Sequence, residues 1–280
     1  MWADPENSAA ATDQHNERIA MRKSTPDNWR KLWTKRNIDE VYPTSEVLVD
    51  NLIKMVDVKG LRILEVGAGS GRDSVRLAKM GAEVYVLDYI KESLDVVRSL
   101  AEREGVTVRY IWGDALAMPI KSDSFDAIFH QGLLEHFRTP DDLRLLQENH
   151  RALKPGGYAL VDVPQTFHIY TVIKQILILL NKWFAGWEKQ FSIAQLRSAM
   201  KQAGFIEKHS YGEWMDPSLF YRILREILWK LRLVNLPLYP KKIPLFLKAR
   251  QNLRRKLSEM EWSKWTFFTI GVIGRKDESA

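Results

Sequence analysis

Residues 63–74 read ILEVGAGSGRDS, and this stretch decides the fold. The apolar ILEV is typical of a buried strand, and Gly67, Gly69 and Gly71 follow it at alternate positions. A helical pattern begins directly after Gly71. Glycine at a strand-to-helix turn permits positive φ and lets a ligand approach the backbone, and the free N–H groups of the helix start favour an anionic group. A tight turn without a ligand is the alternative for this motif alone.

The spacing of these glycines argues against a dinucleotide. A dinucleotide fingerprint reads G-x-G-x-x-G, and its third glycine would fall on Arg72. Asp88 ends the next apolar run, 17 residues after Gly71, where a carboxylate can accept both hydroxyls of a ribose. Asp114 follows the third apolar run, near the expected position of an adenine amino group.

Short apolar runs alternate with helical patterns over about residues 44–212. Strands are predicted over 61–68, 82–89, 106–114, 125–132 and 158–165. Helices are predicted over 45–58, with Ser45 as N-cap, and over 72–81 and 91–104, and the stretch 140–157 follows the fourth strand in the same alternation. This alternation indicates an α/β fold with a parallel sheet, helices on both faces, and a ligand outside the carboxyl ends of the strands.

Four segments in order resemble the motifs of class I S-adenosylmethionine-dependent methyltransferases: ILEVGAGSG, VYVLDY, GDALAMPIKSDSFDAIF and LKPGGYALVDVP. The likeness is strongest to the type 11 group, which includes quinone-biosynthesis methyltransferases. It covers about residues 60–165, and segments 191–205 and 267–276 resemble the family's later helix and final strand. The resemblance implies a Rossmann-like, doubly wound, mostly parallel seven-stranded sheet. It also implies S-adenosyl-L-methionine as cofactor and no metal.

The resemblance further implies a set of cofactor-binding residues. The expected contacts are to the methionine moiety from Glu65, Gly67, Ala68, Gly69 and Gly71, to the ribose from Asp88, to the adenine from Tyr89, Asp114 and Ala115, and to the methyl-donor region from the backbone of Gln131. An ordinary buried aromatic is the alternative for Tyr89. LKPGG, residues 153–157, is expected to be a structural turn into the fifth strand and not a ligand site.

The end of the fourth predicted strand, FHQGLLEHF, offers candidates for a general base. A hydroxyl or activated-carbon acceptor must lose a proton, and histidine is the usual base. His130 is the first catalytic candidate and His136 the second, each with a structural role as the alternative. Glu135 is expected to orient the backbone or the cofactor region. The chain lacks an Asn/Asp-Pro-Pro-aromatic motif here, which disfavours DNA-adenine, protein-glutamine and RNA-base acceptors.

Charge is concentrated in one segment. The 280 residues carry a formal charge of +7, and residues 214–262, with eleven Lys/Arg and four Asp/Glu, account for all of it. Phe220, Ile223 and Ile227 belong to one apolar helical face of this segment, and Pro237, Pro240 and Pro244 are expected to break the helix. We therefore divide the chain into a mobile tail (1–24), a methyltransferase core (25–213), a basic amphipathic helical cap inserted before the last strand (214–262), and the final strand with a tail (263–280).

Two interpretations of the cap remain open. It is either a helical lid over the acceptor entrance or a surface that meets anionic lipid headgroups. Nucleic acid is disfavoured, because the basic residues alternate with Leu and Ile and no RNA-binding module is visible. The N-terminal residues lack the features of a secretion signal, so a cytoplasmic location is expected, with peripheral binding at the inner face of the membrane as an alternative. The chain has no cysteine, which excludes disulfides and thiolate chemistry.

These patterns predict a methyltransferase that acts on a small, lipophilic, hydroxylated or activated-carbon acceptor. The first alternative is O-methylation of a sugar or another polar metabolite. The second is a protein that binds S-adenosylmethionine without catalysis.

Overall fold

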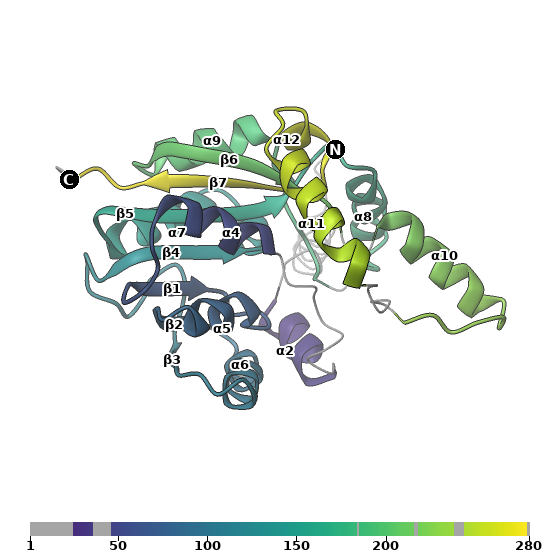
Figure 1. Ribbon diagram of the computed structural model, residues 1–280, viewed down its shortest axis with the longest axis horizontal. Coiled ribbons are helices and arrows are strands. Elements are labelled where there is room, and N and C mark those ends of the chain that lie inside the picture. The colour runs from purple at the N-terminus through teal and green to yellow at the C-terminus, as the bar shows by residue number, and fades with distance from the viewer. Residues whose placement is uncertain (1–24, 36–45, 184, 216–217, 238–243, 279–280) are drawn as a thin grey trace, which may run out of the picture.

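The computed structural model describes residues 25–35, 46–183, 185–215, 218–237 and 244–278. Within them a seven-stranded sheet has the order β3-β2-β1-β4-β5-β7-β6 (Figure 1). The strands are β1 (Arg62–Val66), β2 (Glu83–Asp88), β3 (Val108–Trp112), β4 (Phe125–Gln131), β5 (Leu153–Pro164), β6 (Ile206–Glu213) and β7 (Thr269–Arg275). All neighbouring pairs are parallel except that β7 runs antiparallel to β5 and β6. The predicted doubly wound, mostly parallel sheet is confirmed.

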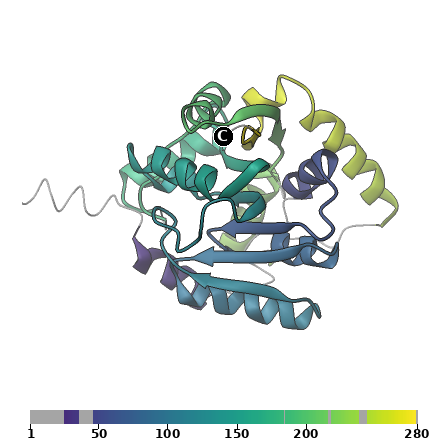
Figure 2. The ribbon, with the colours of Figure 1, turned by 90° about the vertical axis from the view of Figure 1, so that its left-hand side faces the viewer.

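Helices cover both faces of this sheet (Figures 1 and 2). One layer of the core joins the sheet to α4 (Glu46–Met55), α5 (Arg72–Lys79) and α6 (Lys91–Arg103). The other joins it to α7 (Asp141–Ala152) and α9 (Ile193–Gln202). Successive strand residues alternate between the layers, so that Ile63 lies in the first and Leu64 in the second. Burial on both faces explains the nearly continuous apolar runs in the sequence.

The stretch LKPGG is part of a strand, whereas the sequence predicted a turn. β5 begins at Leu153, which pairs with Phe125, and the next pair joins Tyr158 to Ala127. The residues between Leu153 and Tyr158 therefore form a bulge, in which Gly156 has a φ of +76°. These residues begin β5, at the end of the strand that lies away from Gln131. That they have a structural role and bind no ligand stays a prediction.

Several elements have no counterpart among the predicted segments. α2 (Pro26–Lys35) packs against α6 through Trp33, which lies beside Ile90. η1 (Leu134–His136) follows β4, α8 (Ile169–Leu179) follows β5, and α12 (Ser263–Thr266) precedes β7. β6 was not placed from the sequence, although the resemblance implied seven strands, and only the second half of IEKHSYGE is buried. The predicted tail 1–24 and the predicted N-cap Ser45 lie outside the described residues.

Within the described residues three helices lie between β6 and β7, and the first two of them fall in segment 214–262. α10 (Leu219–Lys230) extends away from the sheet and has no buried side chain (Figure 1). It ends at Lys230, well before Pro237, so the prolines do not break it as expected. Pro244 instead begins α11 (Pro244–Ser258), a position that suits proline, and Pro240 lies outside the described residues. No helix in the described ranges is long and apolar enough to cross a membrane.

Candidate functional site

The glycine turn lies where β1 ends and α5 begins. Gly67, Gly69 and Gly71 have φ angles of +73°, +50° and +66°, a region that side chains rarely adopt. The Gly67 N–H donates to the carbonyl oxygen of Leu87 at 2.8 Å, which ties the turn to β2. A Cβ on Gly71 would overlap the side chain of Val97 in α6. The turn is therefore fixed by both backbone conformation and packing.

Two carboxyls, the buried Glu65 and the partly buried Asp88, flank this turn on the α5 side of the sheet. Glu65 of β1 accepts a hydrogen bond from Ser74 Oγ at 2.5 Å. Asp88, the last residue of β2, accepts from Ile90 N at 2.7 Å and from Ser93 Oγ at 2.9 Å. Burial raises the pKa of both carboxyls, and the nearby charges of Asp73 and Asp88 raise the pKa of Glu65 further.

These carboxyls suit a ligand that brings hydrogen-bond donors and positive charge. A carboxylate oxygen has more than one lone pair, so Asp88 can accept from a ligand in addition to Ile90 and Ser93. An ammonium group beside Glu65 would favour the ionised form of this carboxyl and offset part of the pKa increase that burial causes. The amino group and ribose hydroxyls of S-adenosylmethionine therefore fit Glu65 and Asp88. Within the described residues no group of three or more His, Asp or Glu could hold a metal ion.

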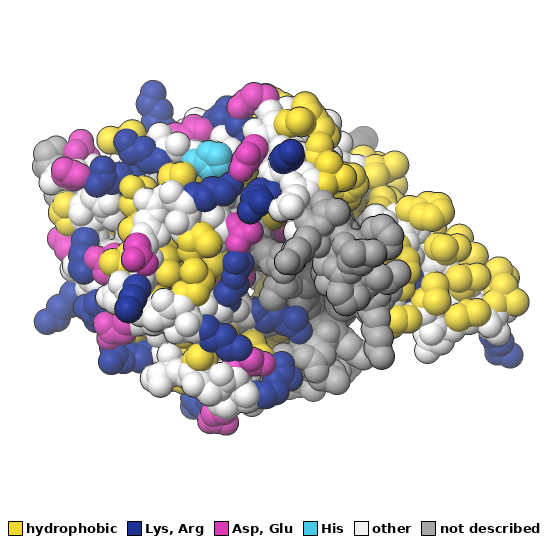
Figure 3. Space-filling view, viewed as in Figure 1, with side chains coloured by type: hydrophobic (Ala, Val, Ile, Leu, Met, Phe, Trp, Pro, Cys, Tyr) yellow, Lys and Arg dark blue, Asp and Glu magenta, His cyan; other side chains and the backbone are white. Residues whose placement is uncertain are grey.

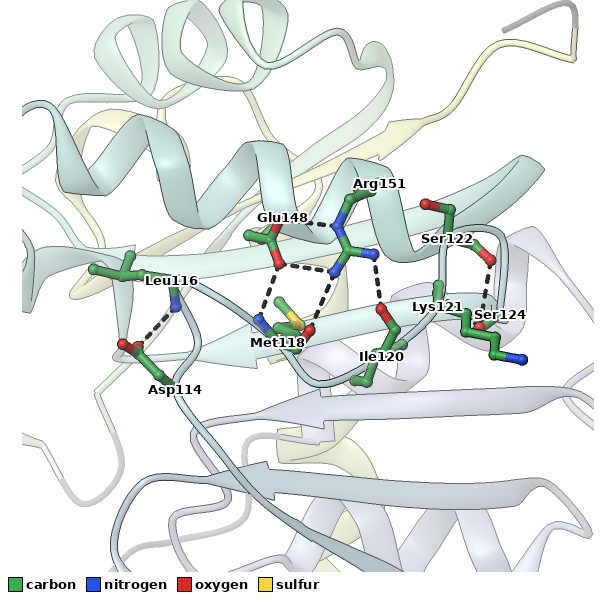
Figure 4. Close-up of polar contacts among 9 residues, drawn as sticks. All are labelled: Asp114, Leu116, Met118, Ile120, Lys121, Ser122, Ser124, Glu148 and Arg151. Carbon is green, nitrogen blue, oxygen red and sulfur yellow. Dashed lines mark hydrogen bonds and ion pairs between the residues drawn. The ribbon is translucent and has the colours of Figure 1, made fainter.

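The loop after β3 carries Asp114 and Ala115 and is pinned to α7 (Figure 4). Asp114 Oδ1 accepts from the N–H of Leu116 at 2.9 Å. Further along, Glu148 Oε2 accepts from Met118 N at 3.0 Å, and Arg151 Nη1 donates to the Ile120 carbonyl at 2.8 Å. These hydrogen bonds hold the loop against α7. Asp114 is exposed and Ala115 is buried.

Two aromatic side chains are exposed at the ends of β2 and β3. Tyr89 is 57% exposed and Trp112 is 64% exposed, so Tyr89 is not the buried aromatic that the sequence left as its alternative. The Trp112 Nε1–H donates to the Tyr89 carbonyl at 3.0 Å. Sequence reasoning missed Trp112, although an aromatic directly before the Gly113–Asp114 pair was a visible signal. Both rings offer flat apolar surface at the edge where adenine is expected.

The two candidate histidines have different surroundings. His130 is 0% exposed, lies on the same face of β4 as Ile128, and has no hydrogen-bond partner on either ring nitrogen. Burial lowers its pKa to about 3. His136 lies in η1 with its Nδ1 buried and unpartnered, and its ring meets that of Trp29 edge-on at a centroid distance of 4.8 Å. Burial lowers the pKa of His136 as well, although the Glu188 carboxylate opposes that shift.

A buried polar cluster adjoins His136, and no sequence pattern indicated it. Lys174 of α8 and Glu188 form an ion pair at 2.5 Å with side chains only 2% and 6% exposed. Trp183 Nε1 also donates to Glu188, at 2.6 Å. Glu135 has one carboxyl oxygen without a partner, and burial together with the Glu188 charge raises its pKa to about 8. These groups come from segments far apart in the chain, so no local spacing announces them.

The structure thus gathers most of the predicted residues at one edge of the sheet. Glu65, the glycine turn, Asp88 and Gln131 lie where β1, β2 and β4 end, and Ala68 is fully buried within the turn. Gln131 is exposed, and its Nε2 donates to Asp162 Oδ2 at 3.3 Å. His136 follows β4 directly in η1. By the alternation along β4, His130 points to the opposite face of the sheet from Gln131.

Comparison with known proteins agrees with this arrangement. Residues 63–157 match the family model described as a methyltransferase domain. A ubiquinone biosynthesis O-methyltransferase of Dinoroseobacter shibae is 32% identical over 164 residues, which are 57% of this chain and 65% of that protein. Another from Roseobacter denitrificans is 28% identical over 52% of this chain and 60% of that protein. The match thus spans less than two thirds of these relatives.

Solved structures share the fold at low sequence identity. An S-adenosylmethionine-dependent methyltransferase of Mesorhizobium loti has a TM-score of 0.53 and 18% identity, covering 81% of this chain and 96% of its own. The cyclase SpnF has a TM-score of 0.55 and 20% identity, covering 82% and 80%. A cyclase among these structures illustrates that the fold alone does not define the reaction. Residues 63–157 therefore form a methyltransferase domain, and the chain has the fold of S-adenosylmethionine-dependent methyltransferases of known structure.

Proposed function

We propose that this chain transfers a methyl group from S-adenosylmethionine to a hydroxyl or activated carbon of a small lipophilic acceptor. The observation that carries the proposal is the convergence of the glycine turn, Glu65, Asp88 and Gln131 at one edge of the sheet. Relatives named ubiquinone biosynthesis O-methyltransferases support a lipophilic, hydroxylated acceptor.

The cofactor site would work chiefly by binding and orientation. S-adenosylmethionine supplies, when bound, an electrophilic methyl group on a sulfonium. Asp88 would accept hydrogen bonds from the ribose hydroxyls, and Glu65 would face the amino group. The start of α5 after Gly71 offers free N–H groups and the positive end of a helix dipole to the carboxylate. Holding the acceptor in line with the reacting bond supplies much of the rate.

His136, and not His130, is the better candidate for the base. A base whose pKa is about 3 has little tendency to take a proton near neutral pH, and His130 is sealed in the core. His136 has an unpartnered Nδ1 and is bordered by the Lys174–Glu188 pair and Trp29. We assign the polar end of the acceptor to this corner, with Trp29 and Trp183 as its apolar wall.

A methyl-transfer assay tests this function. Labelled S-adenosylmethionine is offered with a catechol that bears an isoprenoid tail, with the same catechol without the tail, and with a monosaccharide. The tailed catechol should be methylated best, and His136→Ala should lower that rate by about 10²–10⁴-fold. His150→Ala is the matched control, because that ring packs against Phe205 at 5.1 Å, on the α7 side.

The other outcomes decide between the alternatives. Transfer to the monosaccharide alone would establish a polar acceptor. Cofactor binding without transfer to any of the three probes, or to a lipid extract, would support a non-catalytic binding protein and refute the proposed activity.

The surface of α10 and the charge of residues 214–262 support a contact with anionic lipid. Phe220 is 76% exposed, and Ile227 and Trp229 of the same helix are about half exposed. Figure 3 shows this apolar surface on the part of the molecule that extends from the body. The segment carries all of the excess positive charge of the chain. An apolar face beside basic residues is typical of helices that lie in the headgroup region of a membrane.

Vesicle sedimentation tests this contact. Wild-type protein should sediment with anionic vesicles at low salt, remain in solution with neutral vesicles, and be released as salt rises. Replacing Arg254, Arg255 and Lys256 with Gln should weaken binding by about a hundredfold, at about 1 kcal/mol for each charge. A control variant replaces Lys79, Arg98 and Arg103, which are exposed side chains outside segment 214–262. It loses the same number of positive charges and should bind like wild type. Wild-type protein that stays in the supernatant would leave the segment as a lid alone.

A further inference from the structure

A row of polar side chains crosses four strands near the cofactor edge. Tyr211 of β6 donates its hydroxyl hydrogen to Asp162 Oδ1 at 2.6 Å, although β7 lies between their strands. Asp162 of β5 accepts a second hydrogen bond at Oδ2 from Gln131 Nε2 of β4, at 3.3 Å. Asp162 and Tyr211 are 0% and 1% exposed, whereas Gln131 is exposed. The row therefore runs from the core to the edge where the ligand is expected.

Gly271 makes the reach across β7 possible. It pairs with Asp162 on one side and with Tyr211 on the other. A Cβ on Gly271 would overlap both Asp162 Oδ1 and the Tyr211 ring. The absence of a side chain at this position is thus a direct requirement of the hydrogen bond between Tyr211 and Asp162.

At its other end the row holds the turn that follows β4. The Asp162 carbonyl accepts from the N–H of Gly132 at 3.0 Å, so Asp162 binds this turn through its backbone as well as through Gln131. The next residue, Leu133, packs on the glycine turn, because a Cβ on Gly67 would lie 3.1 Å from Leu133 Cδ1. A shift of the 131–133 turn would therefore also displace the glycine turn, where the cofactor is expected.

Burying the carboxyl group of Asp162 costs more free energy than burying an apolar side chain, so packing alone does not account for it. Burial opposes the ionised form of Asp162, and the charges of Glu213 and Asp73 oppose it further. Buried polar networks of this kind give one defined arrangement where an apolar core tolerates several. The arrangement defined here is that of the residues beside the glycine turn.

We propose that Tyr211, Asp162 and Gln131 are positioning residues that hold the 131–133 turn against the glycine turn and thereby set the affinity for S-adenosylmethionine. This inference rests on the cofactor site of the proposed function and needs no acceptor. It goes beyond that function by assigning a role to β6 and β7, which contribute no predicted cofactor contact.

Calorimetric titration with S-adenosylmethionine tests the proposal. Tyr211→Phe keeps the buried ring and removes one donor to Asp162, and it should weaken cofactor affinity about tenfold, the scale of one intramolecular hydrogen bond. The matched control is Tyr85→Phe. The Tyr85 hydroxyl accepts from Arg62 at 2.9 Å and donates to Glu83 at 2.9 Å, and both partners begin their strands at the opposite edge. The Tyr85→Phe variant should have a lower melting temperature and an unchanged affinity for S-adenosylmethionine.

Gln131→Met provides a second variant in case Tyr211→Phe does not fold. It removes only the side-chain hydrogen bond of an exposed residue and should weaken affinity in the same direction. The double variant should lose less than the sum of the two single losses, because both act through Asp162.

The outcomes separate this proposal from the cofactor site. Variants that melt at lower temperature but bind S-adenosylmethionine like wild type would overturn the positioning role and leave only a structural one. Absence of binding by the wild-type chain would instead refute the cofactor site and the proposed function.

Discussion

Asp73 should make the stability of the unliganded protein fall as pH rises. Its side chain lies in the first turn of α5, it is 7% exposed, and Oδ1 has no hydrogen-bond partner. Burial raises its pKa from 3.8 to about 7. The carboxylates of Glu213 and Asp50 add to the shift, while Arg76 and Arg72 oppose it. A folded pKa above the unfolded value means that the unfolded chain loses this proton first. Stability is therefore full below about pH 4 and is lost progressively up to about pH 7.

The size of the effect follows from the two pKa values. Between pH 5 and pH 8 the linkage relation gives a loss of about 2–3 kcal/mol from this one group. Urea unfolding at both pH values should thus show a pH-dependent loss that is about 2–3 kcal/mol smaller in Asp73→Asn than in wild type. Asp95→Asn, at a carboxyl that is 64% exposed, serves as the control and should keep the wild-type difference. An Asp73→Asn protein with the wild-type pH dependence would show that Asp73 is ionised in the folded state and that the burial argument is wrong.

Further substitutions test the site and the glycine turn. Asp88→Ala should fold and weaken S-adenosylmethionine binding by about 1.5–3 kcal/mol, because hydrogen bonds to a charged group are lost; unchanged affinity in calorimetry would contradict the ribose assignment. His130→Ala should reduce stability and activity together, as expected of a packing residue. His136→Ala should lower turnover with little change in melting temperature. The reverse pattern would restore His130 as the base. Gly71→Ala should destabilise by more than the ~1–3 kcal/mol of a strained φ, because its Cβ also meets Val97. Gly105→Ala, at a φ of +67° with open space around it, isolates the backbone cost, and equal losses in urea unfolding would refute the steric argument.

The cofactor side of the site could be predicted from the sequence because its residues are held by near neighbours. Asp88 is bonded by residues two and five positions further on, and Glu65 by Ser74. Such contacts leave short patterns of glycine, acid and apolar run that are legible without a structure. The strands are legible for the same reason, since burial on both faces makes them apolar throughout.

The remaining elements depend on contacts that no local pattern records. Half of β6 is exposed, so its sequence lacks a strand signal, and its place comes from pairing with β7, which lies more than fifty residues later in the chain. The LKPGG bulge depends on its register with β4, and glycine and proline there gave a turn signal instead. Trp29 meets His136 only because α2 packs beside α6.

The division between local and distant contacts also separates the two halves of the candidate site. The groups that would meet the cofactor belong to β1, β2, β4 and the turns that directly follow them. The groups around His136 come from α2, α8 and the segment with Glu188, which lie far from the glycine turn in the sequence. The halves meet at the 131–133 turn, where Gln131 is bonded to Asp162 and Leu133 touches Gly67. A shared turn of this kind would couple the proposed acceptor wall to the proposed cofactor site, and a tie from β6 through Asp162 would hold that turn in place.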